Sequence, residues 1–439
     1  MRHCDLLVSR GLVVDAHEGV REDTALAVRG NRLIEVGPSV ELASRYHAER
    51  TLDAAGKIVL PGLINGHTHA SATLFRGYAS DVSGKGFFDR MWRIEALLTD
   101  EDVYVGALAG CLEMIKSGVT GFANHFSHMD QVARAVQKTG IRAGLSRTML
   151  DRGDASAADR EVEEGVRFAK QWAGKCSRIQ PMLGPHAAYT CSDRLLQLAA
   201  DEARRSGLML HLHVAESPHE RELMRERTGT TTVQHLERLG FFGENRVLGA
   251  HSLLLDDRDL EVLGSHEFHA VICAAGKMNR GQGIADLPRL LAAGINVCLG
   301  TDGSASDNLD VLMAMKATYI AQNHLREQVG ALRPERVLEM ATTGATGALG
   351  WEMGRLASGQ LADLILVDTR RLHLRPLITA PRSNVVFNLV YYATGADVDT
   401  VIIDGNVVME GRELLTVDED EVLDRLQERA QELWQRAAH

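Results

Sequence analysis

The stretch Val59–Leu74 reads VLPGLINGHTHASATL and places two histidines directly after an apolar run. Alternate residues of a β-strand point to the same side, so His67 and His69 share one side and Thr68 faces the other. Two imidazoles a few ångströms apart make half of a metal site. A lone His-x-His pair is common on loops, so a metal site requires further ligands from elsewhere in the chain.

Seven more apolar runs alternate with long helical segments between residues 57 and 350. This alternation is typical of parallel strands joined by helices. Eight such units in roughly 290 residues predict an α/β fold, a (β/α)8 barrel of the TIM type, whose usual size is ~250 residues. The eight runs are KIVLPGLINGHTH, GVTGFANHF, IRAGLSRTMLD, IQPMLGPHAAYT, GLMLHLHVAES, RVLGAHSLLL, HAVICAAG and INVCLGTDG.

The two ends of the chain are predicted to form a second, smaller domain. Both ends contain short β-like runs, with hairpin signals at the Gly-Asn pairs of residues 30–31 and 405–406. We expect residues 1–56 and 354–439 to build a composite β-sandwich domain around a barrel of residues 57–353. The last stretch, DEDEVLDRLQERAQELWQRAAH, predicts a charged amphipathic helix.

Composition narrows the class of protein. The 439 residues are 45% hydrophobic and 24% charged, as in soluble globular proteins. A net charge of −11 argues against binding to nucleic acid. No run approaches the ~20 apolar residues of a membrane span, and the N-terminus lacks a signal-peptide pattern. The six cysteines form no CxxC pair and predict reduced thiols in a cytoplasmic protein, with Cys176 and Cys191 left open as a disulfide.

Chemistry in such a barrel lies at the carboxyl ends of the strands. Five of the eight runs end in polar residues of the types that bind metals, which packing alone explains poorly. Three neutral imidazoles and one carboxylate suit zinc or a similar divalent ion. His211 alternates in phase with His213, so spacing does not exclude it. The predicted ligands are His67, His69, His213 and Asp302.

These ligands predict a single metal ion that activates water. The run that ends at His186 contains no lysine to bridge a second ion. A metal held in this way lowers the pKa of bound water towards neutrality. We predict three catalytic residues: Asp302 binds the metal and accepts the proton of the water, Glu216 carries protons to the leaving group, and His251 orients the nucleophile or polarises the tetrahedral centre.

Four motifs, PGLINGHTHA, HLHVAES, GAHSLLL and LGTDGSASDNLD, occur in this order. Together they resemble the amidohydrolase superfamily, and most of all its branch of S-adenosylhomocysteine/methylthioadenosine deaminases and triazine chlorohydrolases. The likeness covers nearly the whole chain. It implies zinc at the four predicted ligands, with iron or manganese as alternatives, a proton shuttle at Glu216 and support from His251.

The resemblance also implies substrate-binding residues. The segment MWRIEALL is similar to one with an acidic ribose ligand, which implies Glu95, with Trp92 as a wall that stacks on the base. LSRTMLD implies Arg147, and DREVEEG implies Arg160, as anchors for a carboxylate tail. GPHAAYTCS implies that His186 contacts the sugar or the base.

Other segments concern the part of the pocket near the base. GSASDN implies that Ser306 lies near the base. The family usually has a histidine and NP.SN.K after its seventh strand, whereas this chain has VICAAGKMNRGQG. Lys277, Asn279 and Arg280 there either meet a different polar substituent or form a solvated loop. FANHFSHMD has histidines, His125 and His128, where the branch usually has an acidic residue and an aromatic residue.

The sequence is compatible with three functions. The first is metal-dependent hydrolytic deamination of an aromatic heterocycle, namely an adenine nucleoside such as S-adenosylhomocysteine or methylthioadenosine, with release of ammonia. The second keeps the site but acts on a free pterin, guanine-like or triazine ring, which loses ammonia, an alkylamine or chloride. The third is a barrel scaffold without catalysis. The expected partner is a small heterocyclic substrate, without nucleic acid or membrane, and the resemblance adds a homodimer.

Overall fold

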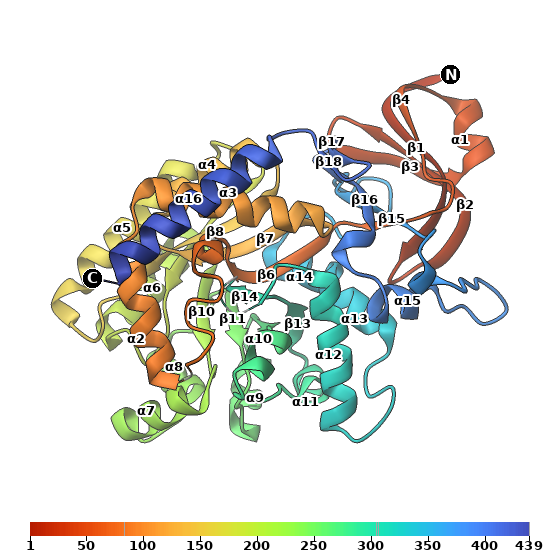
Figure 1. The fold of residues 1–439 in the computed structure, drawn as a ribbon. Coiled ribbons are helices and arrows are strands. Elements are labelled where there is room, and N and C mark those ends of the chain that lie inside the picture. Colours follow the sequence, from red (N-terminus) through yellow and green to blue (C-terminus); the bar gives the residue numbers. More distant parts are fainter. Residues whose placement is uncertain (83, 304, 306, 439) are drawn as a thin grey trace.

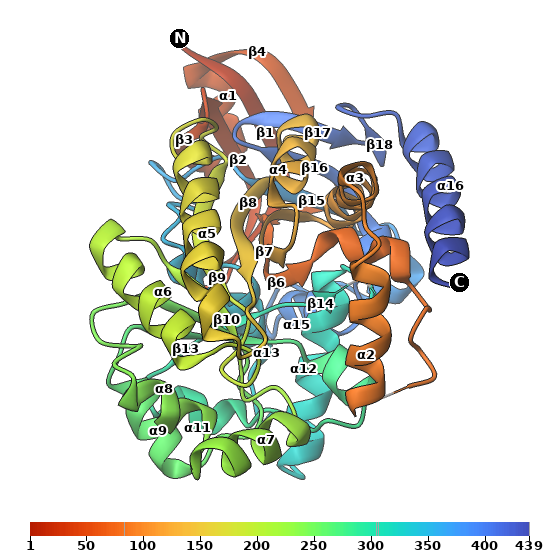
Figure 2. The same ribbon diagram turned by 90° about the vertical axis from the view of Figure 1, so that its left-hand side faces the viewer.

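Two large sheets organise the chain in the computed structural model, which describes residues 1–82, 84–303, 305 and 307–438 (Figure 1). One sheet curls into the barrel, and the other is built from both ends of the chain. Helices connect the barrel strands and wrap its outer surface (Figure 2). The two units share one continuous hydrophobic core that includes Ile58 and Leu60 beside Val119 and Phe122.

The barrel strands pair in parallel and in chain order. The short strand β14 continues the eighth unit after β13 and pairs with β6, while the Thr301 amide donates to the His67 carbonyl at 3.2 Å. These contacts join the last strand to the first, so the predicted barrel is confirmed. Its strands are β6 (Leu63–His69), β7 (Val119–Phe126), β8 (Arg142–Met149), β9 (Ile179–Pro185), β10 (Leu210–Val214), β11 (Val247–His251), β12 (Phe268–Ile272), β13 (Asn296–Leu299) and β14 (Asp302–Gly303).

Helices follow most of the barrel strands and bury their apolar faces against them. The helices are α1 (Ser39–Arg45), η1 (Ala70–Phe75), α2 (Gly84–Glu95), α3 (Asp100–Lys116), α4 (Met129–Thr139), η2 (Ala155–Ala157), α5 (Ala158–Trp172), α6 (Asp193–Ser206), α7 (Pro218–Thr228), α8 (Thr232–Arg238), α9 (Asp257–Gly264), α10 (Ala274–Asn279), α11 (Leu287–Ala292), α12 (Val311–Leu325), α13 (Pro334–Ala341), α14 (Thr343–Leu349), η3 (Leu372–Leu374), α15 (Val385–Tyr391), η4 (Gly395–Asp397) and α16 (Glu419–Ala437). Among the described residues, none of these helices is long and apolar enough to cross a membrane.

The second sheet combines strands from both ends of the chain, as predicted. Its order is β18-β17-β16-β15-β5-β1-β2-β3, and β4 pairs with the first half of β1. Because β1 pairs with β4 and then with β5, the sheet forks along this long strand. The strands are β1 (Arg2–Asp15), β2 (Gly19–Arg29), β3 (Arg32–Pro38), β4 (Tyr46–Asp53), β5 (Lys57–Pro61), β15 (Leu364–Asp368), β16 (Val398–Ile403), β17 (Asn406–Glu410) and β18 (Glu413–Leu414).

The structure divides the first predicted barrel run into two strands at Gly62. β5 pairs with β1 and β15 in the small sheet, and only β6 enters the barrel. A Cβ atom on Gly62 would lie 2.0 Å from the Thr120 hydroxyl oxygen, so the chain passes between the two sheets where only glycine fits. We therefore propose Gly62, rather than residue 57, as the start of the barrel.

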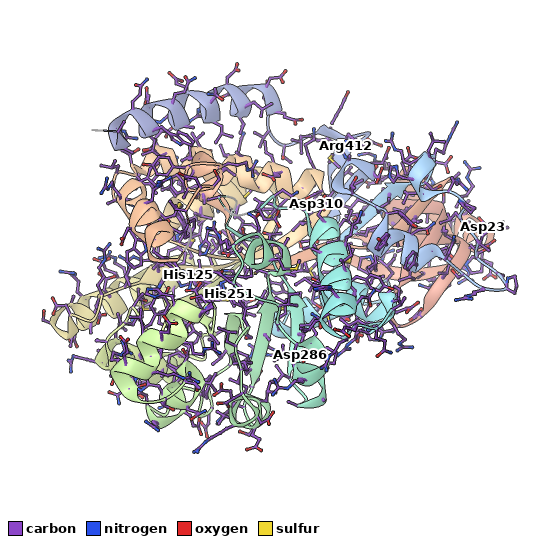
Figure 3. The ribbon with its side chains drawn as sticks, turned by 60° about the horizontal axis from the view of Figure 1, so that its bottom comes forward. Asp23, His125, His251, Asp286, Asp310 and Arg412 are labelled. Atoms are coloured by element: carbon purple, nitrogen blue, oxygen red, sulfur yellow. The ribbon has the colours of Figure 1, made fainter. Side chains whose placement is uncertain are left out.

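Buried polar contacts hold the two units together. The Arg142 guanidinium on β8 is bidentate to the fully buried Asp363 carboxylate, at 3.0 and 3.1 Å, just before β15. Arg412 donates to the Gly395 and Val398 carbonyls, and the Asp310 carboxylate accepts from the Gly395 amide at 2.7 Å. Figure 3 labels Arg412 and Asp310 where the small sheet meets α12.

The predicted C-terminal helix is α16, and it packs against the barrel rather than the small sheet. Arg429 and Arg436 both donate to the buried Asp102 at the start of α3, at 2.6 and 2.8 Å. The Trp434 indole donates to the Leu74 carbonyl in η1. All six cysteines are free thiols, so the disulfide left open between residues 176 and 191 does not form.

Candidate active site

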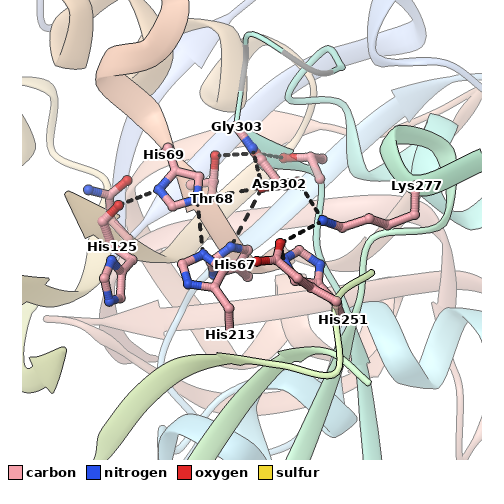
Figure 4. Close-up of polar contacts among 12 residues, drawn as sticks. His67, Thr68, His69, His125, His213, His251, Lys277, Asp302 and Gly303 are labelled. Carbon is pink, nitrogen blue, oxygen red and sulfur yellow. Dashed lines mark hydrogen bonds and ion pairs between the residues drawn. The ribbon is translucent and has the colours of Figure 1, made fainter. Parts of the chain in front are cut away.

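The four predicted ligands converge at the carboxyl ends of the barrel strands (Figure 4). Nε2 of His67 and Nε2 of His69 lie 3.7 and 3.5 Å from the same oxygen, Oδ1 of Asp302. Nε2 of His213 lies 3.4 Å from Nε2 of His69. Because β6, β10 and β14 end at one rim, residues more than two hundred positions apart in the chain meet here.

Backbone carbonyls turn the imidazoles so that their Nε2 atoms face one another. Nδ1 of His69 contacts the His125 carbonyl, and Nδ1 of His213 contacts the His186 carbonyl at 2.7 Å. Each Nδ1 therefore carries the proton, which leaves the Nε2 lone pair for a metal. Nε2 of His67 is buried without a hydrogen-bond partner.

Burial also keeps two of the imidazoles neutral. It lowers the pKa of His67 to about 4 and lowers the pKa of His213 well below the ordinary histidine value. Neutral imidazole is the form that ligates metals. The unpartnered nitrogen, the neutral rings and the adjacent carboxylate together fit a divalent ion of the zinc type.

His211 contacts the predicted ligand His67 through one ring nitrogen and Ser146 through the other. Its Nε2 accepts from Nδ1 of His67 at 2.8 Å, and its Nδ1 lies 2.9 Å from the Ser146 hydroxyl, which donates to the Asn124 carbonyl. Both ring nitrogens are therefore occupied by protein partners. His213 lines the cavity and its Nε2 faces Nε2 of His69, which favours His213 over His211 as the predicted ligand.

Asp302 combines a strained backbone with a strongly cationic setting. Its φ is +66°, a left-handed value that costs free energy in a non-glycine residue, and the Gly303 amide donates to its Oδ1 at 2.8 Å. Burial alone would raise its pKa, but Lys277 and the neighbouring histidines outweigh this effect and hold the pKa well below the ordinary value. Asp302 therefore stays a carboxylate at neutral pH.

Glu216 is the second carboxylate of the site, and its loop is held by a neighbour on α7. The buried Glu220 carboxylate accepts the amides of Ala215 and Glu216 at 3.0 and 2.6 Å. The Tyr189 hydroxyl donates to Oε1 of Glu216 at 2.6 Å. These contacts direct Glu216 into the cavity beside His213.

His251 ends β11 with a positive φ of 84° and is almost fully buried. Both of its ring nitrogens lack a hydrogen-bond partner. Its Nε2 lies 3.7 Å from Oε2 of Glu216, and one of its nitrogens groups with ligand atoms of His67 and Asp302. Figure 3 places His251 and His125 inside the barrel. The structure thus places His251 beside Glu216 and the predicted ligands His67 and Asp302.

A cavity of about 340 Å³ opens over these residues. It is lined by Trp92 and Glu95 from α2, by Arg147 from β8 and by His186 after β9. Arg160 does not line it, since its side chain is 68% exposed and pairs with Glu161. Ser306 lies outside the described residues.

The predicted substrate-binding residues differ in their existing protein contacts and in their protonation states. The Arg147 guanidinium already pairs with Glu161 at 3.3 Å and with Glu164. Burial in the cavity raises the pKa of Glu95 to about 7, against the weaker opposing effects of His69 and Arg152. His186 faces the cavity as a neutral ring, because burial lowers its pKa to about 4.

Sequence reasoning assigned no role to several residues in or beside the cavity wall. Arg152, in the turn after β8, lies over the Trp92 ring at 5.2 Å. His125 lines the cavity with a buried, unpartnered Nε2, and Tyr189 contacts Glu216. Lys277 is buried and lines the cavity, so it is a pocket residue and not part of a solvated loop. Their positional signal was that each lies near the carboxyl end of a barrel strand: His125 is the penultimate residue of β7, and Arg152, Tyr189 and Lys277 follow β8, β9 and β12 by three, four and five residues.

A parallel (β/α)8 barrel with three histidines and an aspartate at its catalytic rim defines the class of metal-dependent hydrolases. Comparison with known proteins identifies the family. Residues 58–408, most of the chain, match the amidohydrolase family. The chain belongs to this family.

Individual relatives are similar over nearly the full length. A 5'-deoxyadenosine deaminase of Methanosarcina acetivorans is 40% identical over 97% of this chain and 97% of its own. A 5-methylthioadenosine/S-adenosylhomocysteine deaminase of Pelotomaculum thermopropionicum is 41% identical over 95% and 96%. The crystal structure of an adenosine deaminase from Xanthomonas campestris with bound zinc superposes with a TM-score of 0.93, at 27% identity and 99% coverage of both chains.

Proposed function

We propose that this protein is a zinc-dependent aminohydrolase that deaminates an adenine nucleoside. The observation that carries the proposal is the convergence of three imidazoles and two carboxylates at one cavity. The full-length relatives named as deaminases of 5'-deoxyadenosine and of methylthioadenosine and S-adenosylhomocysteine support the reaction class.

Zinc would be held by His67, His69, His213 and Asp302, and when bound it would supply Lewis acidity that makes water a nucleophile at neutral pH. The attacking water adds to the ring carbon that bears the amino group. Asp302 accepts the proton of that water, since its pKa keeps it ionised at neutral pH. The water is oriented from the opposite side by His251, whose nitrogens have no other partner.

Glu216 moves the protons of the reaction. It takes the other proton of the water and delivers it to the ring nitrogen next to the reacting carbon, and it then relays the proton held by Asp302 to the departing amine. The carbon–nitrogen bond then breaks, ammonia leaves and the ring carbonyl forms, so one water is consumed for each ammonia released. Tyr189 donates to Oε1 of Glu216 and holds the carboxylate towards the cavity.

The sugar and the base would contact the wall that α2 provides. Trp92 is placed to stack on the base, and Glu95 to accept hydrogen bonds from ribose hydroxyls. His186 adds a neutral donor and acceptor. Arg147 already pairs with two glutamates, and Arg160 does not line the cavity. We therefore propose that Arg152, which does line it, is the cation that faces the 5′ substituent.

Ammonia release from the zinc-loaded protein tests the function. The panel contains adenosine, 5'-deoxyadenosine, methylthioadenosine and S-adenosylhomocysteine, beside guanine, a pterin and a chlorotriazine followed by chloride release. Turnover of the adenine nucleosides is expected, and Glu95→Ala should lower their kcat/KM by ~10-fold or more because a buried polar contact is lost. Turnover of a free ring alone, with Glu95→Ala unchanged, would favour the second hypothesis instead.

Two further expectations stay predictions. The first is a homodimer, which light scattering on the purified protein tests. The second is a cytoplasmic location, which fractionation of the source cells tests. The free thiols agree with a reducing compartment.

A further inference from the structure

The ammonium of Lys277 lies between the two carboxylates of the site. Lys277 is in α10, directly after β12, and is 3% exposed. Its Nζ lies 3.2 Å from Oε2 of Glu216 and 3.4 Å from Oδ2 of Asp302. Figure 4 shows the contact of Lys277 with Asp302. Lysine is rarely buried unless it is paired, so these two contacts account for its position.

Lys277 and Tyr189 hold opposite oxygens of Glu216. Tyr189 donates to Oε1 at 2.6 Å, and Lys277 donates to Oε2. A glutamate side chain has several rotamers, and a donor on each oxygen selects one of them. Hydrogen bonds to a charged partner in a buried setting are among the strongest in proteins.

The same ammonium separates two like charges. Glu216 and Asp302 are both nearly buried, and without a cation between them their repulsion would favour rotation of Glu216 away from the centre. Glu216 lies in the β10–α7 loop and Asp302 in β14, so Lys277 bridges two separate elements. The donated bonds thus fix the distance between the proton carrier and the proton acceptor.

We propose that Lys277 is a positioning residue for proton transfer, which acts through Glu216 with Tyr189 as its counterpart. This inference rests on the proposed function, in which Glu216 carries the protons. In this role Lys277 does not touch the reacting atoms. It orients the carboxylate and keeps it near Asp302.

Kinetics of the zinc-loaded protein test the role. Lys277→Met, which keeps the length of the side chain but removes the charge, should lower kcat by ~30-fold or more while KM changes less than ~3-fold. In a Glu216→Gln background the same substitution should change the residual kcat by less than ~3-fold, because it acts through Glu216. Tyr189→Phe should lower kcat in the same direction by a smaller factor.

Equal loss of kcat in both backgrounds would overturn the proposal. So would a rise in KM with kcat unchanged, because Lys277 would then contact substrate directly. Lys170→Met, on the exposed face of α5, is the matched control and should leave kcat and KM unchanged.

Thermal unfolding gives a second measurement that needs no substrate. Lys277→Met should lower the Tm of the metal-loaded protein, and it should lower it less in the Glu216→Gln background, where one of the two charges is already gone. If Lys277→Met lowers Tm by the same amount in both backgrounds, the two side chains do not interact and the proposal is overturned. If the wild-type protein turns over no compound in the panel, the proposed function fails, while this cycle still decides the placement of Lys277.

Discussion

At the scale of single residues, the site depends on which nitrogen of each histidine carries a proton. Carbonyls of His125 and His186 accept from Nδ1 of His69 and His213, and His211 accepts from Nδ1 of His67. Three Nε2 lone pairs therefore face a common point beside Asp302. The site is preorganised because these supports belong to the strand ends themselves.

Glu216→Gln should abolish proton transfer and leave the metal in place. The amide cannot accept and return a proton, so we expect kcat to fall by ~10²-fold or more. Because Glu216 is not a predicted ligand, metal content measured by mass spectrometry should stay at the wild-type value. Glu222→Gln, on the exposed side of α7, is the control. Loss of metal in Glu216→Gln would contradict this assignment of roles.

Glu95 should make stability depend on pH. Burial raises its pKa from 4.5 to about 7, so the folded state binds more protons than the unfolded state between these values. The contribution of Glu95 to the free energy of unfolding is then highest below pH 4.5 and falls as pH rises through about 7. Glu95→Gln should raise Tm at pH 8 by ~1–3 °C relative to wild type and change it less at pH 5. A larger gain at pH 5 than at pH 8 would contradict the shift.

At the scale of elements, the apolar runs predicted the barrel strands well because parallel strands are buried on both faces. β7 is buried at every residue, and its run is apolar along most of its length. The division of β5 from β6 was missed, since apolar residues continue from β5 into the start of β6 and the change of sheet occurs within one residue, Gly62. Helix α16 was predicted from its pattern, but its partner was not.

Asp102 should be the anchor of α16. It is fully buried and accepts from Arg429 and Arg436. Asp102→Asn leaves two guanidinium groups with weaker partners and should lower the free energy of unfolding by ~1–3 kcal/mol. Hydrogen exchange in α16 should increase together with this loss. Glu101→Gln, which removes the exposed partner of Arg425, should have a much smaller effect.

The pKa of Asp102 determines the pH range over which its contacts with Arg429 and Arg436 stabilise α16. Burial alone would raise the pKa of Asp102, but hydrogen bonds from Arg436, Thr99 and Arg429 outweigh it and lower the pKa below the ordinary value of 3.8. The stabilisation is therefore complete above the ordinary aspartate pKa and is lost as pH falls through the folded value. Protection of α16 that declines with rising pH, between pH 5 and 8, would contradict this direction.

At the scale of the whole molecule, the barrel and the small sheet are one packed body. Their shared core and the buried Arg142–Asp363 pair join β8 to the segment before β15. The metal site lies at the opposite end of the strands from this pair. A ligand that binds the folded site alone should therefore stabilise the protein as a whole.

Metal removal should lower Tm by several degrees, because binding at the folded site adds RT ln(1 + [L]/Kd) to the free energy of unfolding. Calorimetry before and after dialysis against a chelator measures the difference, and added zinc should reverse it. His67→Ala removes one ligand, so its Tm should respond little to the chelator. A Tm of the wild-type protein that is insensitive to chelation would contradict a metal site built from these four residues.

The sequence alone determined the barrel and the β unit from both ends, and it placed the four predicted metal ligands, Glu216 and His251 at strand ends, because strand periodicity and the strand-end rule are local properties. Only the tertiary structure decided that His211 contacts His67, that Arg147 is paired and Arg160 exposed, that Lys277 and Arg152 line the cavity, and that Tyr189 donates to Glu216. These outcomes depend on which loop tips meet across the rim. That meeting follows from the closure of the barrel, which no single segment encodes.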